Sequence, residues 1–167
     1  MEIKPKAKVY IDGANIFYAQ KKIGWSLDWS KIKEVLGKDR EVIEWRYYVA
    51  VKDGEDQMQS YLRYLDAIKF TAVTKSLKKI NLQPTGYMYK ANFDVEMAVD
   101  ILLDKASVDE VILFSGDSDF SYLIRKLRDA GKKVTVFAFR QTIAWELKLA
   151  ASKVIYLDKM KDEIMRK

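Results

Sequence analysis

Hydrophobic and polar positions change period along the chain, and these changes predict strands and helices in alternation. Short runs rich in β-branched and aromatic residues indicate strands at 8–11, 42–51, 85–90, 108–114, 133–139 and 154–157. Apolar residues three and four positions apart indicate helices at 14–22, 30–36, 94–106, 118–130 and 143–151. The stretch 55–82 holds neither glycine nor proline, so we expect one helix there, or two helices that meet at a bend near residues 70–71.

The alternation of these elements predicts the fold class. Parallel strands need a crossover connection, which is usually a helix, and such crossovers are right-handed. We therefore expect an α/β fold with a mostly parallel central sheet and helices on both faces. The sequence contains no internal repeat, no low-complexity tract and no linker rich in proline or glycine. The 167 residues fit the size of one domain, so residues 1–167 are expected to form a single domain.

Two residue types are missing from the chain, and this limits its chemistry. There is no cysteine and no histidine, which excludes disulfides, zinc sites built from these residues, cysteine proteases and hydrolases with a Ser-His-Asp triad. Catalysis must then use carboxylates, hydroxyls, amines or a metal ion bound by oxygen. The net charge of +6 and the pI of 9.3 fit a polyanionic partner, and they fit solubility alone equally well.

The sequence shows no pattern typical of a membrane protein or an exported protein. No stretch of 18 or more apolar residues is present, so we expect no membrane-spanning helix. The first eight residues are polar and basic, and the apolar run at 9–11 is too short for a signal peptide. We therefore expect a cytoplasmic protein.

Acidic residues follow three of the predicted strands. Asp12 follows the strand at 8–11, Asp94 follows the strand at 85–90, and Asp117 and Asp119 follow the strand at 108–114. In an open α/β sheet, ligands bind beyond the carboxyl ends of the strands, so we expect these carboxylates to meet at one edge. Like charges repel unless a cation neutralises them, and oxygen ligands suit Mg²⁺ or Mn²⁺.

Each of these residues also has a simpler structural explanation. Aspartate is a favoured N-cap, so Asp12 or Asp94 alone would be explained by the helix that follows it. One of Asp117 and Asp119 is expected as a cap, although two are more than capping requires. Asn15 alone would be explained as a turn residue. A carboxylate after each of three strands favours a site over a set of caps.

Four motifs, in the right order over nearly the whole chain, resemble those of the NYN domain, in the LabA-like (DUF88) branch of the PIN-like nuclease superfamily. They are Ile-Asp-Gly-Ala-Asn at 11–15, Asp-Val at 94–95 with Asp100 further on, Ser-Gly-Asp-Ser-Asp-Phe at 115–120, and Gly-Lys-Lys-Val at 131–134. The resemblance implies a Rossmann-like (PIN-like) three-layer sandwich. It also implies an acidic pocket that binds Mg²⁺ or Mn²⁺ and cleaves RNA, with DNA as the less favoured substrate.

The chain departs from the family pattern in two places. Ala-Asn-Phe-Asp stands at 91–94, where the family usually has Gly-Val-Asp, and Ala-Ser-Lys stands at 151–153, where an aspartate is often found. Asp100 receives no role from the sequence. Six positions on an ideal helix are a rotation of about 240°, so its side chain points away from that of Asp94 unless the helix starts after Asp94.

The resemblance implies a role for each acidic residue. Asp12, Asp94 and Asp117 would bind one or two divalent ions, which activate water and stabilise charge on a phosphate. Asp119 would be a further ligand or would orient a water molecule. The chain would then be a ribonuclease that depends on Mg²⁺ or Mn²⁺.

Polar and basic residues would bind the substrate. Asn15 would orient Asp12 or contact the scissile phosphate, and Ser115 would hydrogen-bond to a phosphate oxygen or a carboxylate. Lys90 and Arg125 would bind phosphates. They belong to two basic groups, Lys75, Lys78, Lys79 and Lys90 near Tyr87 and Tyr89, and Arg125, Lys126, Arg128, Lys132 and Lys133. The alternative for any single lysine is a solvated surface position.

Two further questions stay open at the level of the sequence. The main alternative function is a non-catalytic module on a PIN-like fold that binds RNA or a protein partner. A homodimer is also open, because 13% aromatic residues and four tryptophans could leave an apolar patch exposed.

Overall fold

The main sheet is parallel throughout. The computed structural model describes residues 3–52, 54–104 and 106–167, apart from the side chains of 87–90. In these residues a six-stranded sheet has the order β3-β2-β1-β6-β7-β8, and each neighbouring pair is parallel. The strands are β1 (Lys6–Asp12), β2 (Glu41–Val51), β3 (Thr71–Ser76), β6 (Glu110–Phe114), β7 (Lys133–Ala138) and β8 (Lys153–Tyr156). The predicted α/β class is confirmed.

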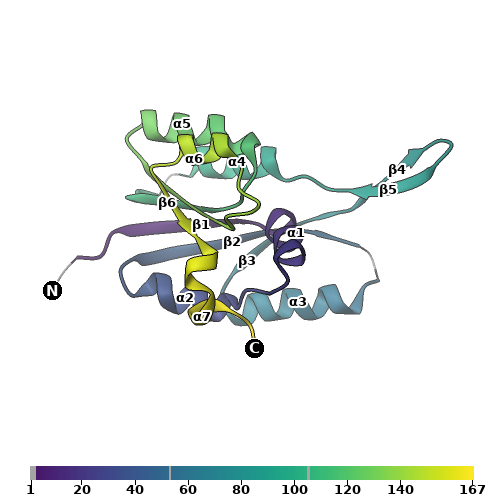
Figure 1. Cartoon of the computed structure of the whole chain (residues 1–167), viewed down its shortest axis with the longest axis horizontal. Helices are drawn as coiled ribbons and strands as arrows, with labels where there is room; N and C mark the ends of the chain where they lie inside the picture. The colour runs from purple at the N-terminus through teal and green to yellow at the C-terminus, as the bar shows by residue number, and fades with distance from the viewer. Residues whose placement is uncertain (1–2, 53, 105) are drawn as a thin grey trace.

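Helices cover both faces of this sheet and complete the expected three layers (Figure 1). One face carries α1 (Gly13–Ile23), α2 (Trp29–Gly37), α3 (Asp56–Ala67) and the short α7 (Lys161–Ile164). The opposite face carries α4 (Asp94–Leu103), α5 (Ser121–Asp129) and α6 (Trp145–Ala150). The mostly parallel sheet with helices on both faces is therefore present as predicted.

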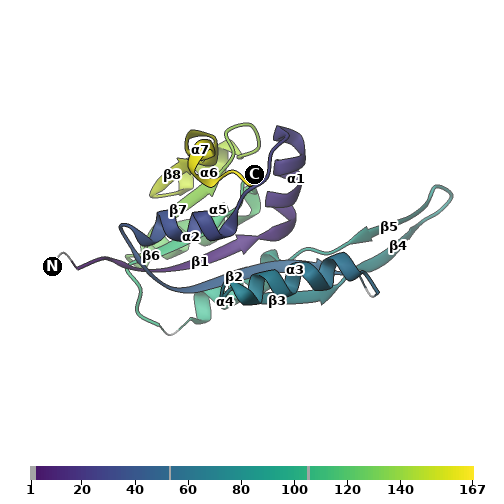
Figure 2. The same cartoon turned by 90° about the horizontal axis from the view of Figure 1, so that it is seen from below.

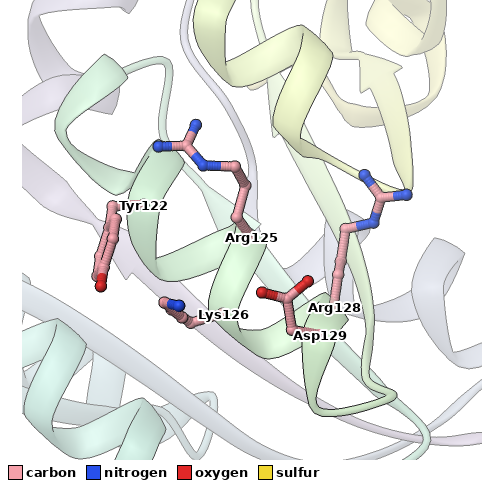
Figure 3. A pocket seen from close by; sticks show the side chains of 5 residues that line it. All are labelled: Tyr122, Arg125, Lys126, Arg128 and Asp129. Atoms are coloured by element: carbon pink, nitrogen blue, oxygen red, sulfur yellow. The ribbon is translucent and has the colours of Figure 1, made fainter.

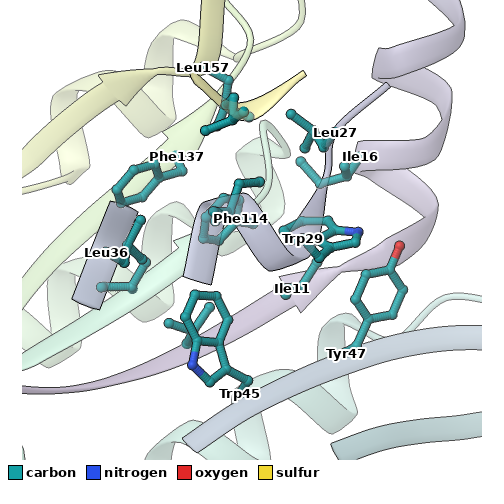
Figure 4. Close-up of a cluster of buried hydrophobic side chains, with 14 of the residues drawn as sticks. Ile11, Ile16, Leu27, Trp29, Leu36, Trp45, Tyr47, Phe114, Phe137 and Leu157 are labelled. Atoms are coloured by element: carbon teal, nitrogen blue, oxygen red, sulfur yellow. The ribbon is translucent and has the colours of Figure 1, made fainter. Parts of the chain in front are cut away.

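Each face has its own hydrophobic core, because successive side chains of a strand point to opposite sides. On β1, Val9 and Ile11 pack with the helices α1 to α3, whereas Tyr10 packs on the α4 side. Figure 4 shows the first core, where the ring of Trp29 meets that of Phe114 edge to face, with 5.4 Å between centres. The two cores hold the central strands in place, and this fixes the positions of the residues at the strand ends.

The helix predicted over residues 55–82 is wrong after Ala67. α3 ends there, Lys69 takes a positive φ of 63°, and Phe70 turns back to stack on Trp45 with 4.7 Å between ring centres. The chain then forms β3, at the edge of the main sheet, and β4 (Lys78–Leu82). The β-branched residues in the stretch 71–74 favour pairing with the free edge of β2, and the absence of glycine and proline does not outweigh this preference.

The strand predicted at 85–90 is present as β5 (Gly86–Lys90), but it does not join the main sheet. It pairs antiparallel with β4 in a hairpin that projects from the body of the molecule (Figures 1 and 2). The expectation that Asp94 follows a buried strand of the main sheet is therefore wrong. The hairpin instead leads the chain back to α4, and the first turn of this helix carries Asp94.

The remaining elements lie close to their predicted ranges. The helix predicted at 118–130 begins as a 3₁₀ turn, η1 (Ser118–Phe120), and continues as α5. A second 3₁₀ segment, η2 (Leu157–Met160), leads into α7. Within the described ranges, none of the helices combines the length and the hydropathy needed to cross a membrane.

Candidate metal centre

Two neighbouring strands bring the first acidic residues together. β1 and β6 are paired in parallel with Ile11 opposite Phe114, so the residues that follow them leave the sheet side by side. Asp12 ends β1, and Asp117 is the N-cap of η1 after β6. From β1 the chain adds β2 and β3 on one side of the sheet, and β6, β7 and β8 follow later on the other side. The strand order therefore reverses between β1 and β6. Such a switch point is the usual place for a ligand in an open α/β sheet.

The third carboxylate comes from the N-terminus of α4. Asp94 is the first residue of this helix, and the preceding Phe93 is buried in the core on that face. One carboxylate oxygen from each of Asp12, Asp94 and Asp117 lies within 4.8 Å of the other two. The structure thus brings together the three residues that the sequence proposes as metal ligands, which we call the Asp triad.

Hydrogen bonds from neighbouring residues orient Asp12 and connect it with the backbone of Asp117. The Oδ1 of Asp12 accepts the N–H of Asn15 (3.2 Å), so Asp12 is also the N-cap of α1, and its Oδ2 accepts the hydroxyl of Ser115 (3.0 Å). The hydroxyl oxygen of Ser115 in turn accepts the N–H of Asp117 (3.1 Å). The Oδ1 of Asn15 accepts the N–H of Gly116 (2.9 Å). The capping and site explanations of Asp12 therefore hold together, because each oxygen keeps a separate partner.

Two glycines allow the backbone to approach closely around this network. A Cβ at Gly13 would lie 2.4 Å from the carbonyl oxygen of Tyr48, and a Cβ at Gly116 would lie 2.7 Å from that of Thr142. Neither position accepts a side chain without a shift of neighbouring backbone. The glycines in the two motifs thus fix the loops that carry Asp12 and Asp117.

Burial and the charges of neighbouring carboxylates raise the pKa values of Asp12 and Asp94. Asp12 is only 8% exposed, so the loss of hydration raises its pKa to about 6, with further contributions from the charges of Asp94 and Asp117. The hydrogen bonds from Asn15 and Ser115 act in the opposite direction. The pKa of Asp94 is also raised, chiefly by burial and then by the charges of Asp117 and Asp119. A cation at this site would reverse the repulsion.

The donor set fits a hard divalent cation. Mg²⁺ binds oxygen at about 2.0–2.1 Å in an octahedral shell, so two of its ligand oxygens lie about 3–4 Å apart. The spacing within 4.8 Å in the Asp triad needs only small side-chain movements to meet this geometry. Carboxylate oxygens without sulfur or imidazole favour Mg²⁺ or Mn²⁺ over zinc or copper.

Asp119 lies beside the triad rather than within it. Its backbone N–H donates to the Oδ1 of Asp117 (3.0 Å), and its side chain is exposed. Its carboxylate is not among the three that converge, although its charge acts on Asp94. This position fits the predicted role of orienting a water molecule better than that of a direct ligand.

Asp100 faces the sheet instead of the Asp triad. Its Oδ2 accepts the hydroxyl of Tyr48 (2.7 Å) and lies 3.3 Å from the Nη1 of Arg46. The rotation of about 240° from Asp94 that an ideal helix predicts is consistent with this direction. Asp100 therefore fastens α4 to β2, and α4 carries Asp94.

The two predicted phosphate-binding cations have different outcomes. Lys90 lies in β5 opposite Lys78, and its side chain lies outside the described residues. Arg125 lies on the exposed side of α5, in a surface hollow of about 470 Å³ (Figure 3). The residues that line this hollow, which we call the α5 hollow, are Tyr122, Arg125, Lys126, Arg128 and Asp129.

The other lysines of the predicted basic groups are partly engaged elsewhere. Lys132 donates to the carbonyl of Val108 (2.9 Å), and Lys133 lies 3.3 Å from Glu110 at the other end of β6. Lys75 forms an ion pair with Glu96 at 2.7 Å. The second basic group is therefore divided between the α5 hollow and the edge of the sheet far from the Asp triad.

Asn92 contacts a member of the Asp triad, and the sequence alone does not single it out as a functional position. Its Nδ2 donates to the Oδ2 of Asp94, and its Oδ1 accepts the backbone N–H of Asp94, both at 2.7 Å. The only signal in the sequence is an asparagine two positions before an aspartate at a helix start, which is typical of local side-chain to backbone bonds. Asn92 therefore orients Asp94 towards the other two carboxylates.

Comparisons with known proteins give the same fold. The sequence model of the NYN domain matches residues 6–158. The low amplitude and bright protein LabA of Synechococcus elongatus is 32% identical over 169 residues, which cover 98% of this chain and 90% of that protein. The crystal structure of a protein of unknown function from Vibrio parahaemolyticus matches with a TM-score of 0.81 at 23% identity, over 99% of this chain and 100% of that one.

Proposed function

The chain belongs to the NYN domain family, and from this premise we propose that it is a metal-dependent nuclease that hydrolyses phosphodiester bonds of RNA. The family lies within the PIN-like nuclease superfamily. The observation that carries the proposal is the convergence of Asp12, Asp94 and Asp117 within 4.8 Å at the switch point of the sheet. If the three carboxylates served only as helix caps, there would be no reason for them to lie so close to one another.

The Asp triad would hold Mg²⁺ or Mn²⁺. The bound ion would supply an activated water nucleophile and would offset the charge that develops on the phosphate. The triad itself would position the ion, because its members come from β1, α4 and the turn after β6, which the two hydrophobic cores hold in place. A chain without histidine can perform this reaction, since no imidazole base is required.

The residues around the triad have supporting roles in this proposal. Ser115 keeps Asp12 and the backbone of Asp117 at fixed positions, and Asn15 joins the start of α1 to the loop after β6. Asp119 is exposed next to Asp117, where its carboxylate would orient a water molecule for attack or for protonation of the leaving oxygen. Ser115 is fully buried, so it acts on Asp12 rather than on the phosphate.

The charge distribution supports a polyanionic substrate. The chain has a net charge of +6, yet the site is made of aspartates. The excess of positive charge must therefore lie outside the site, where it attracts phosphates at long range. The three carboxylates themselves repel a phosphate, and a bound divalent ion would offset this local repulsion.

The proposal is tested by cleavage of a labelled, unstructured RNA oligonucleotide. We expect degradation with Mn²⁺ or Mg²⁺ and none with EDTA. Asp117→Asn should lower the rate by about 100-fold or more, because even partners outside the ligand shell of a metal contribute 10–100-fold. The control is Asp162→Asn on α7, which makes the same change of charge at an exposed position. It should leave the rate unchanged.

The same experiment distinguishes the nuclease from the alternative function. Equal residual cleavage by the unaltered chain and by Asp117→Asn would mean that the activity comes from a contaminant. The chain would then be a non-catalytic module that binds RNA or a protein. An oligodeoxynucleotide of the same sequence serves as the second substrate, and we expect slower cleavage of DNA than of RNA.

A further inference from the structure

The α5 hollow lies beside the candidate metal centre in the chain and in the fold. α5 starts directly after η1, and the N-cap of η1 is Asp117 of the Asp triad. Tyr122 is therefore in the first turn of α5, at the end nearest to the centre. Lys126 follows one turn further along, about 6 Å away at 1.5 Å per residue. Asp129 ends the helix at the far end of the hollow.

The lining of the hollow combines an exposed aromatic ring with cations. The side chain of Tyr122 is 65% exposed, and its ring belongs to neither of the two hydrophobic cores. The Nζ of Lys126 lies 5.4 Å from the centre of this ring, and Arg125 extends from the same helix in a different direction from the ring (Figure 3). Arg128 is held in place by a hydrogen bond from its Nη1 to the carbonyl of Ala150 (2.8 Å).

These features fit one kind of ligand better than others. A flat, exposed ring offers a stacking surface to an unpaired base, and neighbouring cations bind the phosphates on either side of it. The bases of a duplex are stacked inside the helix. The phosphates of a duplex would contact the cations, but no base would stack on the ring of Tyr122. An acidic peptide would also use the cations alone. Three cations against the single carboxylate of Asp129 leave the lining positive.

We propose that the α5 hollow binds the single-stranded segment of RNA next to the scissile bond, with one base on Tyr122 and the adjacent phosphates on Arg125 and Lys126. This inference rests on the proposed function only in that the bound strand continues towards the Asp triad. The substrate is then a single strand or an unpaired region, and α5 sets its direction across the molecule. The bound segment ends at Asp129, at the far end of α5, because the carboxylate of this residue repels the next phosphate.

Binding is measured without turnover, by fluorescence anisotropy of a labelled oligouridylate in EDTA. Tyr122→Ala should weaken binding at least fivefold, in line with 1–3 kcal/mol for one stacked base. Tyr122→Phe should keep the affinity within about twofold, because it keeps the ring. The control Lys159→Ala, at an exposed position of η2, should also stay within about twofold.

The salt dependence isolates the phosphate contact. Arg125→Ala should weaken binding and lower the slope of log K against log salt by about 0.7, the value for one phosphate contact with a single strand. Tyr122→Ala should lower the affinity and leave the slope unchanged. Both side chains are exposed, so thermal melts of the two variants should match that of the unaltered chain.

Several results would overturn the proposal. One is an unchanged affinity for oligouridylate in both Tyr122→Ala and Arg125→Ala. Another is an RNA duplex that binds as tightly as the single strand, with the same loss on Tyr122→Ala. A third is polyglutamate that competes as well as RNA of equal charge, since the hollow would then suit an acidic protein.

The outcome is separate from that of the proposed function. If Asp117→Asn abolishes cleavage while the α5 variants bind normally, the nuclease stands and the α5 hollow is rejected. If no cleavage is found and the α5 variants still lose affinity, the hollow is supported and the nuclease is rejected.

Discussion

Asp12 serves two purposes, and its environment raises the free energy of its charge. One oxygen caps α1 through the N–H of Asn15, and the other accepts the hydroxyl of Ser115. These bonds would lower the pKa of an exposed aspartate, yet burial and the nearby carboxylates raise it to about 6. The folded chain without metal therefore holds a destabilised negative charge at Asp12 at neutral pH. A bound cation would stabilise this charge.

The destabilised charge of Asp12 predicts a specific dependence of stability on pH. The pKa is 3.8 in the unfolded chain and about 6 in the folded chain, so the folded state binds more protons between these values. Asp12 should therefore lower the free energy of unfolding as pH rises from 4 to 6, by at most about 3 kcal/mol, and its contribution should be constant above that range. Asp12→Asn should remove the part of the fall that Asp12 causes, and it should have a higher free energy of unfolding than the unaltered chain at pH 7.5 in EDTA.

Urea denaturation of both proteins at several pH values in EDTA provides the measurement. Asp94 contributes in the same direction, because its pKa is also raised, so the difference between the two proteins isolates Asp12. An asparagine at position 12 can still accept the N–H of Asn15, and the capping bond is kept. A variant that is clearly less stable at pH 7.5 would show that the charge of Asp12 serves α1 alone.

At the level of elements, the position of α4 decides whether a triad exists. The helix sits on the sheet partly through polar contacts: Tyr48 donates to Asp100 (2.7 Å), and Tyr10 donates to Asp104 (2.9 Å). These contacts lie on the side of the helix that faces the sheet. Asp94, at the first position of the helix, is thereby held over the ends of β1 and β6. We regard Asp100 as a positioning residue.

Asp100→Asn distinguishes a positioning residue from a metal ligand. The variant weakens the bond from Tyr48 and the contact with Arg46, so it should lose about 1–3 kcal/mol of stability. It should need several times more Mn²⁺ for half-maximal cleavage, and it should regain most of the rate at saturating Mn²⁺. The measurement is the rate of RNA cleavage as a function of Mn²⁺. A variant as inactive as Asp117→Asn at every Mn²⁺ concentration would make Asp100 a ligand.

The sequence predicts the elements that rest on strong local patterns and fails where tertiary pairing decides. The apolar runs of β1 and β6 are unambiguous, so the sequence alone places Asp12 and Asp117 at one edge of a parallel sheet. Residues 71–76 carry no comparable signal, because their strand forms by pairing with the edge of β2. The strand at 85–90 is predicted, but its antiparallel pairing with β4 is not, because residues 78–82 lie in the stretch where the sequence predicts a helix.

The candidate site shows the same division between local and distant causes. The sequence predicts Asp94 in the site because it follows the strand at 85–90, but this strand lies outside the main sheet. Asp94 reaches the site because α4, which begins with this residue, packs on the sheet. Asn92 and Tyr122 are not recognisable as functional positions from the sequence, since an asparagine before a helix and a tyrosine within one are common. Only the carboxylate beside Asn92 and the exposed ring of Tyr122 single them out.

On the scale of the whole molecule, charge and shape agree with action on a polyanion. The acidic centre lies at the carboxyl end of the sheet, and a basic hollow lies along the adjacent helix α5 (Figure 3). A homodimer and a cytoplasmic location stay predictions from the sequence. Trp29 and Trp45 belong to the core, whereas Trp145 is 64% exposed on α6.

The central claim is that Asp12, Asp94 and Asp117 together bind the divalent ion on which cleavage depends. Anomalous scattering from a crystal grown with Mn²⁺ tests it most directly, because the signal locates manganese without reference to activity. We predict a strong anomalous peak about 2.1–2.2 Å from an oxygen of each of the three carboxylates, and no such peak in crystals of Asp117→Asn. Manganese bound elsewhere, with these three carboxylates free of it, would contradict the claim.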